Sequence, residues 1–221
     1  MTRQEKWEAK LASLTAPLVP LWEKGIMRIA GIDEAGRGPL AGPVVAACVV
    51  MPKEPLILGI DDSKKLSETR RRELCAEILA SALDFGIGIV DVETIEKSNI
   101  LESARLAFQR SLEALREVPQ CVFTDAMKIY AKCPVISSVK ADSRIYTVAA
   151  ASIVAKETRD GIMREYDRIY PAYGFRKHKG YGTKAHREAI MREGPCPIHR
   201  RSFLKKLLSE QQEGKESPQG R

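Results

Sequence analysis

Two adjacent carboxylates at the end of an apolar run constrain this chain more than any other feature. The run over 27–32 is typical of a buried strand, and it leads directly into Asp33 and Glu34. Carboxylates are costly there unless something positive lies beside them, and Mg²⁺ prefers hard oxygen ligands of this kind. Gly36, Arg37 and Gly38 follow at once. The glycines let the backbone approach a ligand closely, and Arg37 supplies a charged fork suited to phosphate. The stretch predicts a metal-dependent enzyme that acts on a phosphodiester.

The hydrophobic pattern predicts an α/β fold. Short apolar runs alternate with helical periodicity after a first hairpin, which is typical of a mixed sheet flanked by helices. Five strands are expected over 26–33, 43–51, 86–92, 121–124 and 135–139. Helices are expected over 1–24, 68–83, 99–116, 143–168, 183–194 and 199–211, with a loop at 171–182. Ser67 and Thr183 are placed to cap two of these helices, and the small residues at 149–155 allow the long helix to lie close against the sheet.

The same pattern divides the chain of 221 residues into four parts. We expect an N-terminal helical add-on outside the main core at 1–25, a catalytic core at 26–170, a basic C-terminal helical extension at 171–212 and a disordered polar tail at 213–221. The sequence assigns no role to the N-terminal segment.

Four acidic residues occupy matching places in this arrangement. Asp33 and Glu34 end the first strand, Asp125 ends the fourth, and Asp142 follows the fifth and opens a helix. In open α/β sheets the strand ends meet at one crevice, where ligands bind. Four converging carboxylates would repel one another unless cations lay between them, and two divalent ions about 3.5–4 Å apart form a clamp for phosphoryl displacement. We therefore expect Mg²⁺ or Mn²⁺ at this edge, with two ions during catalysis.

Each acid also has a structural interpretation. Asp33 and Glu34 could be the carboxylates of a turn, Asp125 could simply close a strand, and Asp142 could cap the following helix. Neighbouring strand residues point to opposite faces, so Asp33 and Glu34 share a metal only if the strand ends or bulges there, which Gly36 favours.

A second acidic pair, at 61–62, stands beside two lysines and is typical of a turn rather than a metal site. Lys64 or Lys65 would then face a phosphate. No Walker-type phosphate loop and no nucleophile turn with a serine occurs in the sequence.

The positive charge of the chain is concentrated in one segment. The formal net charge is +7, and residues 176–206 contain ten Lys/Arg against two Glu, together with all three histidines. Such a segment is the electrostatic signature of nucleic-acid binding, although a solvated basic face is the plainer interpretation. His178, His186 and His199 are expected to contact phosphate or cap helices rather than to act as general acids.

Cysteine usage and the start of the chain indicate a cytoplasmic protein. The five cysteines form no Cys-x-x-Cys pair, so reduced thiols are expected and a structural zinc site is not. The charged first residues do not resemble a secretory signal, and no apolar run reaches the roughly 18 residues of a membrane span. Nothing in the sequence favours an oligomer, so a monomer is expected.

At the four acids and the Gly36–Gly38 turn, the chain strongly resembles bacterial type 2 ribonuclease H (ribonuclease HII). The resemblance covers about 27–204 and is carried by GIDEAGRGPLAGPVV at 31–45, DSKKL at 62–66, KAD at 140–142, AAASIVAK at 149–156, TRD at 158–160, YGF at 173–175, HKGYGT at 178–183 and HRRSF at 199–203. It implies a ribonuclease H-like fold with a C-terminal helical extension. It also implies endonucleolytic cleavage of the RNA strand of RNA–DNA hybrids and cutting on the 5′ side of single ribonucleotides in duplex DNA, which leaves 3′-hydroxyl and 5′-phosphate ends.

The resemblance also assigns residues to roles. The four metal-binding acids of the family map onto Asp33, Glu34, Asp125 and Asp142, and its glycine-arginine-glycine motif maps onto Gly36, Arg37 and Gly38. The tyrosine that reads the junction after the ribonucleotide maps onto Tyr181, with Tyr173 as its nearest competitor. The phosphate backbones would be held by Lys64 or Lys65 and by the basic segment. Biological roles in removing misincorporated ribonucleotides and RNA primers would follow.

Four positions depart from the pattern of the family. Ala126 follows the third acid and Ala141 precedes the fourth, where the family usually has glycine, and Ser143-Arg144 replaces its usual Ala-Lys. These changes affect the fine geometry of the third and fourth acids rather than the activity.

Two rival functions stay open at this point. Junction resolvases and transposases use similar acid clusters in a similar fold, and removing the Gly36–Gly38 turn with Tyr181 would distinguish them, because only ribonucleotide selectivity should be lost. A non-enzymatic binder of RNA–DNA hybrids would have no cleavage for Asp33→Asn to abolish.

Overall fold

A five-stranded mixed sheet forms the centre of the protein. The computed structural model describes the backbone of residues 1–216 and the side chains of residues 1–209. The sheet has the order β3-β2-β1-β4-β5. The strands are β1 Ile29–Ala35, β2 Val44–Val50, β3 Asp84–Val90, β4 Cys121–Asp125 and β5 Val135–Ser138. Because β1 is antiparallel to β2 and parallel to β4, the predicted mixed sheet is confirmed.

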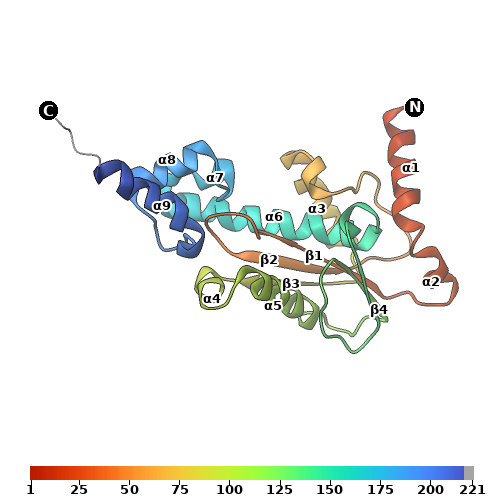
Figure 1. The fold of residues 1–221 in the computed structure, drawn as a ribbon. Helices are drawn as coiled ribbons and strands as arrows, with labels where there is room; N and C mark the ends of the chain where they lie inside the picture. Colours follow the sequence, from red (N-terminus) through yellow and green to blue (C-terminus); the bar gives the residue numbers. More distant parts are fainter. Residues whose placement is uncertain (217–221) are drawn as a thin grey trace.

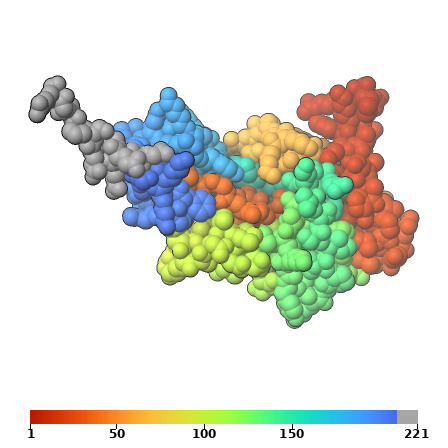
Figure 2. Space-filling view, in the orientation of Figure 1, coloured from red at the N-terminus to blue at the C-terminus, as the bar shows by residue number. Residues whose placement is uncertain are grey.

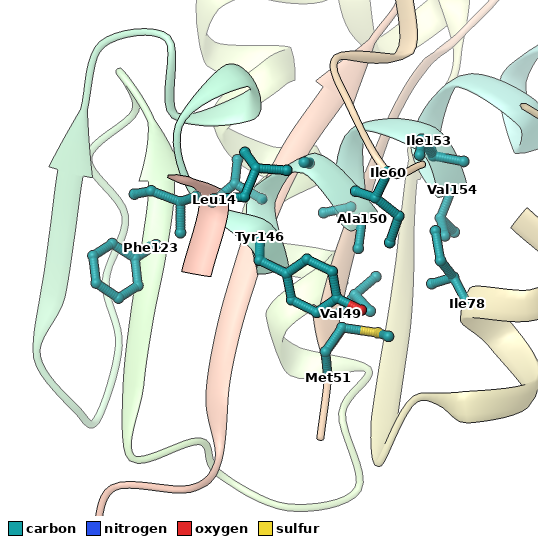
Figure 3. Close-up of a cluster of buried hydrophobic side chains, with 14 of the residues drawn as sticks. Leu14, Val49, Met51, Ile60, Ile78, Phe123, Tyr146, Ala150, Ile153 and Val154 are labelled. Atoms are coloured by element: carbon teal, nitrogen blue, oxygen red, sulfur yellow. The ribbon is translucent and has the colours of Figure 1, made fainter. Parts of the chain in front are cut away.

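Helices cover both faces of the sheet (Figure 1). On one face α6 (Tyr146–Ile169) and α3 (Glu68–Ser81) pack over a large apolar core, part of which is drawn in Figure 3. On the other face α5 (Ile100–Glu113) and α4 (Val92–Lys97) cover a second core. The predicted caps are confirmed, since the side chains of Ser67 and Thr183 accept backbone hydrogen bonds from Arg70 and His186. Within the described part of the chain, no helix has the length and apolar character of a membrane span.

The helix α6 lies in close contact with the central strand β1. A Cβ built on Gly31 of β1 would lie 2.2 Å from the backbone carbon of Thr147 in α6, so only glycine fits at this position. The alanines at 149–151 are fully buried, and Ala150 lies among the larger side chains of the core in Figure 3. Small residues on both elements therefore bring the helix backbone down onto the central strand, as the sequence predicted.

The N-terminal segment is part of the core, which differs from the expectation for 1–25. It forms α1 (Arg3–Thr15) and α2 (Val19–Glu23), separated at the prolines. Leu14 and Leu18 are fully buried and Trp22 nearly so, and all three belong to the cluster under α6. The amphipathic pattern indicated an apolar face, but it could not indicate what that face would cover.

Further differences lie at the ends of elements and in the loops. The helix α4 was not predicted, and it is separate from α5 because Asn99 caps the new helix by accepting from Leu101 and Glu102. The expected loop at 171–182 contains the short helices η3 (Pro171–Tyr173) and α7 (Phe175–His178).

The C-terminal extension is completed by α8 (Lys184–Glu193) and α9 (Arg201–Glu216). It lies beyond the end of α6 and away from α1 (Figures 1 and 2). Because α9 continues to Glu216, four residues of the predicted tail are helical, and 217–221 lie outside the described residues.

Ala126, directly after β4, has a φ of 49°, in the left-handed region. Ala126→Gly should raise the melting temperature by roughly 1–3 °C, because this backbone costs alanine about 1–2 kcal/mol and the entropy of glycine offsets only part of it. Differential scanning calorimetry measures the change. As a control, Ala185→Gly in α8 should lower the melting temperature, and a fall for Ala126→Gly would refute the account.

Candidate active site

Asp33 and Glu34 lie inside β1 rather than after it. The strand pairs with β2 without interruption through Ala35, whereas its pairing with β4 stops at Ile32. The expectation that the strand ends or bulges at the acids is therefore wrong. Ala35 packs in the core under α6 and Ile32 in the core under α5, so the alternation of the strand places Asp33 on the α6 face and Glu34 on the α5 face. Neither residue is in a turn.

Asp125 and Asp142 are joined through the backbone. An Oδ1 atom of Asp125, at the end of β4, accepts a hydrogen bond of 3.0 Å from the amide of Ala141. This contact fixes η2 (Ala141–Ser143), the short 3₁₀ helix that carries Asp142. The side chain of Asp142 is buried, and it is not the cap of α6, because that position is occupied by Ile145.

The carboxyls interact with one another across the edge of the sheet. Burial raises the pKa of Asp33 well above its usual value, and repulsion from Glu34 and Asp142 adds to the effect. Burial also raises the pKa of Glu34, against the pull of Arg37, and repulsion from Asp125 acts in the same direction. The pKa of Asp142 is raised by burial and by repulsion from acidic neighbours. The edge is therefore short of positive charge.

Two basic side chains reach these acids. Lys64 Nζ lies 3.5 Å from an Oδ2 atom of Asp142, and Arg37 Nη1 lies 3.4 Å from Oε1 of Glu34. Lys64 is in η1 (Ser63–Lys65), which Asp62 caps, so the second acidic pair is a turn as expected. Lys65 instead pairs with Asp61 at 3.6 Å.

Two buried arginines donate hydrogen bonds to the backbone of the turn after β1. Arg200 donates to the carbonyls of Gly36, Arg37 and Gly42, and Arg159 donates to those of Ala41, Pro43 and Lys179. Both guanidinium groups are fully buried and meet backbone oxygens rather than carboxylates in these contacts. With the carbonyls engaged, the backbone amides of Arg37 and Gly38 have no acceptor among the described residues.

The roles of these arginines were missed from sequence. A signal was present, because Arg159 continues the buried stripe of Ala151, Ala155 and Met163 along α6 at intervals of four residues. A cation in an otherwise apolar stripe needs buried partners. For Arg200 no comparable pattern exists, since its partners are more than 150 residues away in sequence.

Tyr181 lies against the same turn. Tyr181 is 42% exposed, and a Cβ built on Gly38 would lie 3.9 Å from a carbon of its ring. The cations of Lys156 and Arg159 lie 5.9 and 5.8 Å from the ring centre. Its competitor Tyr173 has a structural part, because its hydroxyl donates to the carbonyl of Gly194 at 2.7 Å.

The histidines of the basic segment form an internal cluster. His186 and His199 are buried, their Nε2 atoms lie 3.0 Å apart, and both rings pack against Phe175. Burial lowers the pKa of each to about 4, so both are neutral at physiological pH. Lys179 and Arg200 are buried as well. The exposed basic surface therefore consists of the other eight cations of 176–206: Arg176, Lys177, Lys184, Arg187, Arg192, Arg201, Lys205 and Lys206.

The four acids offer the hard oxygen ligands that a divalent cation requires, and a cation would relieve the repulsion that raises three of their pKa values. The donor set thus fits such an ion. Among the described residues no three His, Cys, Asp or Glu side chains are grouped closely enough to hold a metal as they stand. Binding would therefore require the acidic side chains to move closer together.

Comparison with known proteins matches these residues to a family. The family model for ribonuclease HII covers residues 30–206. The chain belongs to the ribonuclease HII family. It is 52% identical over 191 residues to ribonuclease HII of Clostridioides difficile, with 85% of this chain and 74% of that protein covered. It is 50% identical to ribonuclease HII of Caldanaerobacter subterraneus, with 85% and 78% covered.

Solved structures agree with this assignment. The ribonuclease H2 of Pyrococcus horikoshii superimposes with a TM-score of 0.71 and 28% sequence identity, covering 84% of this chain and 99% of that one. The protein is therefore a nuclease with a ribonuclease H-like fold, a hydrolase that acts as an endoribonuclease on RNA–DNA hybrids.

Because burial raises the pKa of Asp33, its ionised form destabilises the metal-free enzyme. The protonated Asp33 carboxyl is compatible with folding, and the folded state loses stability as the pH rises from the pKa of an unfolded aspartate through the raised pKa of the folded state. Asp33→Asn should raise the melting temperature in EDTA by roughly 2–4 °C at pH 8, and the gain should shrink towards pH 4.

The matched control is Asp91→Asn. The amide of Thr94 lowers the pKa of the Asp91 carboxyl, which caps α4, so its loss should reduce stability at pH 8. The melting temperatures are measured between pH 4 and pH 8. A gain in melting temperature for Asp33→Asn that does not depend on pH would contradict the raised pKa of Asp33.

Proposed function

We propose that this enzyme cuts on the 5′ side of ribonucleotides, both in RNA–DNA hybrids and at single ribonucleotides within duplex DNA. The products would carry 3′-hydroxyl and 5′-phosphate ends. The observation that carries the proposal is the acidic edge of β1 and β4 beside a turn whose carbonyls are held by buried arginines. Metal ligands would place cations at the phosphodiester that is cut, and free backbone amides could donate to the neighbouring 2′-hydroxyl.

In this proposal Asp33, Glu34, Asp125 and Asp142 bind two divalent cations, Mg²⁺ or Mn²⁺. When bound, such ions lower the pKa of an attacking water and stabilise the leaving oxygen. Asp33 and Glu34 approach from opposite faces of β1, and Asp125 holds the segment of Asp142 through the amide of Ala141. The raised pKa values of Asp33, Glu34 and Asp142 supply the electrostatic reason for cation binding.

The turn at Gly36, Arg37 and Gly38 would read the 2′-hydroxyl, the group that distinguishes RNA from DNA. The amides of Arg37 and Gly38 are available as donors, and Gly38 leaves room for a backbone to come close. The exposed side chain of Arg37 would hold the adjacent phosphate. Tyr181 would stack on the deoxyribose that follows the ribonucleotide, since its exposed ring borders Gly38.

The duplex would be held by charge. Lys64 lies beside Asp142 and Lys65 beside Asp61, and both lysines are exposed. The exposed cations of 176–206 would contact the phosphate backbones, which gives binding without sequence preference and a steep dependence on salt. In the cell such a monomeric, cytoplasmic enzyme would remove misincorporated ribonucleotides and RNA primers.

The proposal is tested with three labelled duplexes of one sequence: DNA with one ribonucleotide, an RNA–DNA hybrid, and all DNA. The wild type should cut the first two in Mg²⁺ or Mn²⁺, 5′ to the ribonucleotide in the first, and should cut nothing in EDTA. Asp142→Asn should lose roughly three powers of ten in rate while still binding the duplex. Asp91→Asn, in a helix cap, is the control and should cut normally.

Two outcomes would overturn the proposal. Cleavage of the all-DNA duplex at a similar rate would indicate a nuclease that does not read the 2′-hydroxyl. Cleavage by Asp142→Asn at the rate of the wild type would show that the acids have been assigned wrongly.

A further inference from the structure

The N-terminal helix α1 touches the acidic edge, although it precedes residues 30–206 that match the ribonuclease HII family. Lys10, in the third turn of α1, donates from Nζ to the carbonyl of Ser143 at 2.8 Å. The same Nζ lies 3.1 Å from Oδ1 of Asp61. One ammonium group thus joins two segments that are far apart in sequence, the one that carries Asp142 and the one that carries Lys64.

These contacts close a ring of interactions. From Asp61 the chain continues to Asp62, whose Oδ1 accepts the amide of Lys64 at 3.0 Å. Lys64 Nζ then lies 3.5 Å from Asp142, and Asp142 is bonded in sequence to Ser143, the acceptor of Lys10. A loss of Lys10 would open this ring at the point where both segments are tied together.

The helix that carries Lys10 is anchored in the core. Leu14, one turn after Lys10 on the same face of α1, is fully buried in the core under α6. A second link runs through Trp7, because the guanidinium of Arg70 lies 5.4 Å from its ring centre and donates to the carbonyl of Leu58 at 3.0 Å. The helix α1 is therefore attached both to the core and to the segment before Asp61.

The surroundings favour a cation at this place. Asp61, Asp62 and Asp142 gather at the edge, and repulsion from Asp62 contributes to the raised pKa of Asp142. The side chains of Lys10 and Asp61 are each only 27% exposed, so their attraction is less screened than that of a surface pair.

We propose that Lys10 is a positioning residue of the active site, which holds the segment of Asp142 against the segment of Asp61–Lys65 in the arrangement needed for cleavage. The inference rests on the function proposed above. It gives the N-terminal segment a functional part: α1 acts as a brace of the catalytic edge in addition to covering the core.

The test compares Lys10→Ala with Lys6→Ala, a matched change at an exposed position of the same helix. On the duplex with one ribonucleotide, Lys10→Ala should lower kcat about threefold to tenfold with KM changed less than about twofold, because a charge-assisted contact to a partly exposed group is lost and no contact with the duplex is removed. Lys10→Arg, which keeps the charge, should recover most of kcat, and Lys6→Ala should match the wild type.

A second measurement does not depend on activity. In metal-free protein, hydrogen–deuterium exchange over 60–66 and 139–146 should be faster in Lys10→Ala than in the wild type, and unchanged in Lys6→Ala. Asp61→Asn should speed exchange in the same peptides, and adding it to Lys10→Ala should have little further effect. If Lys10→Ala does not fold, Lys10→Gln is measured in its place.

The inference is overturned if the kcat and exchange of Lys10→Ala equal those of Lys6→Ala, or if Lys10→Arg is as impaired as Lys10→Ala. Failure of the proposed function is a separate result, because the wild type would then not cut at the ribonucleotide. Hydrogen–deuterium exchange would still show whether Lys10 holds the two segments together.

Discussion

The close approach of α6 to β1 is the constraint on which the rest of this structure depends. Gly31 leaves no room for a side chain between the central strand and the backbone of Thr147, and the alanines at 149–151 bring the helix onto the sheet. This contact places Asp33 against α6, and it places Asp142 just before the first turn of that helix. The same helix carries Arg159 to the turn after β1. One packed pair of elements therefore positions both the acids and the turn.

Two buried arginines link the turn after β1 to the C-terminal extension through hydrogen bonds. A guanidinium group without a carboxylate partner is costly to bury, and here the cost is offset by carbonyls that converge on Arg159 and Arg200. Arg200 is contributed by the extension and Arg159 by the core, so the turn is fixed from both sides. This arrangement explains how an extension of helices can keep Tyr181 beside Gly38.

Much of this was predictable because it follows from local pattern. The apolar runs gave the five strands, and the caps at Ser67 and Thr183 gave two helix starts. Other features depend on contacts between distant residues. The pattern around Glu34 could not show that β1 continues along β2 after its pairing with β4 has ended. Likewise, the amphipathic pattern of α1 could not show that Lys10 meets Ser143, more than 130 residues away.

We propose above that the acidic edge of β1 and β4 binds divalent cations. The most direct test is the binding of Mn²⁺ to the free enzyme, followed by the electron paramagnetic resonance of the unbound ion, with Mg²⁺ as competitor. The wild type should bind Mn²⁺ that Mg²⁺ displaces, and Asp33→Asn should bind Mn²⁺ at least about tenfold more weakly, since a buried carboxylate ligand is lost. Equal binding by wild type and Asp33→Asn would contradict this proposal, because the ion would then lie elsewhere.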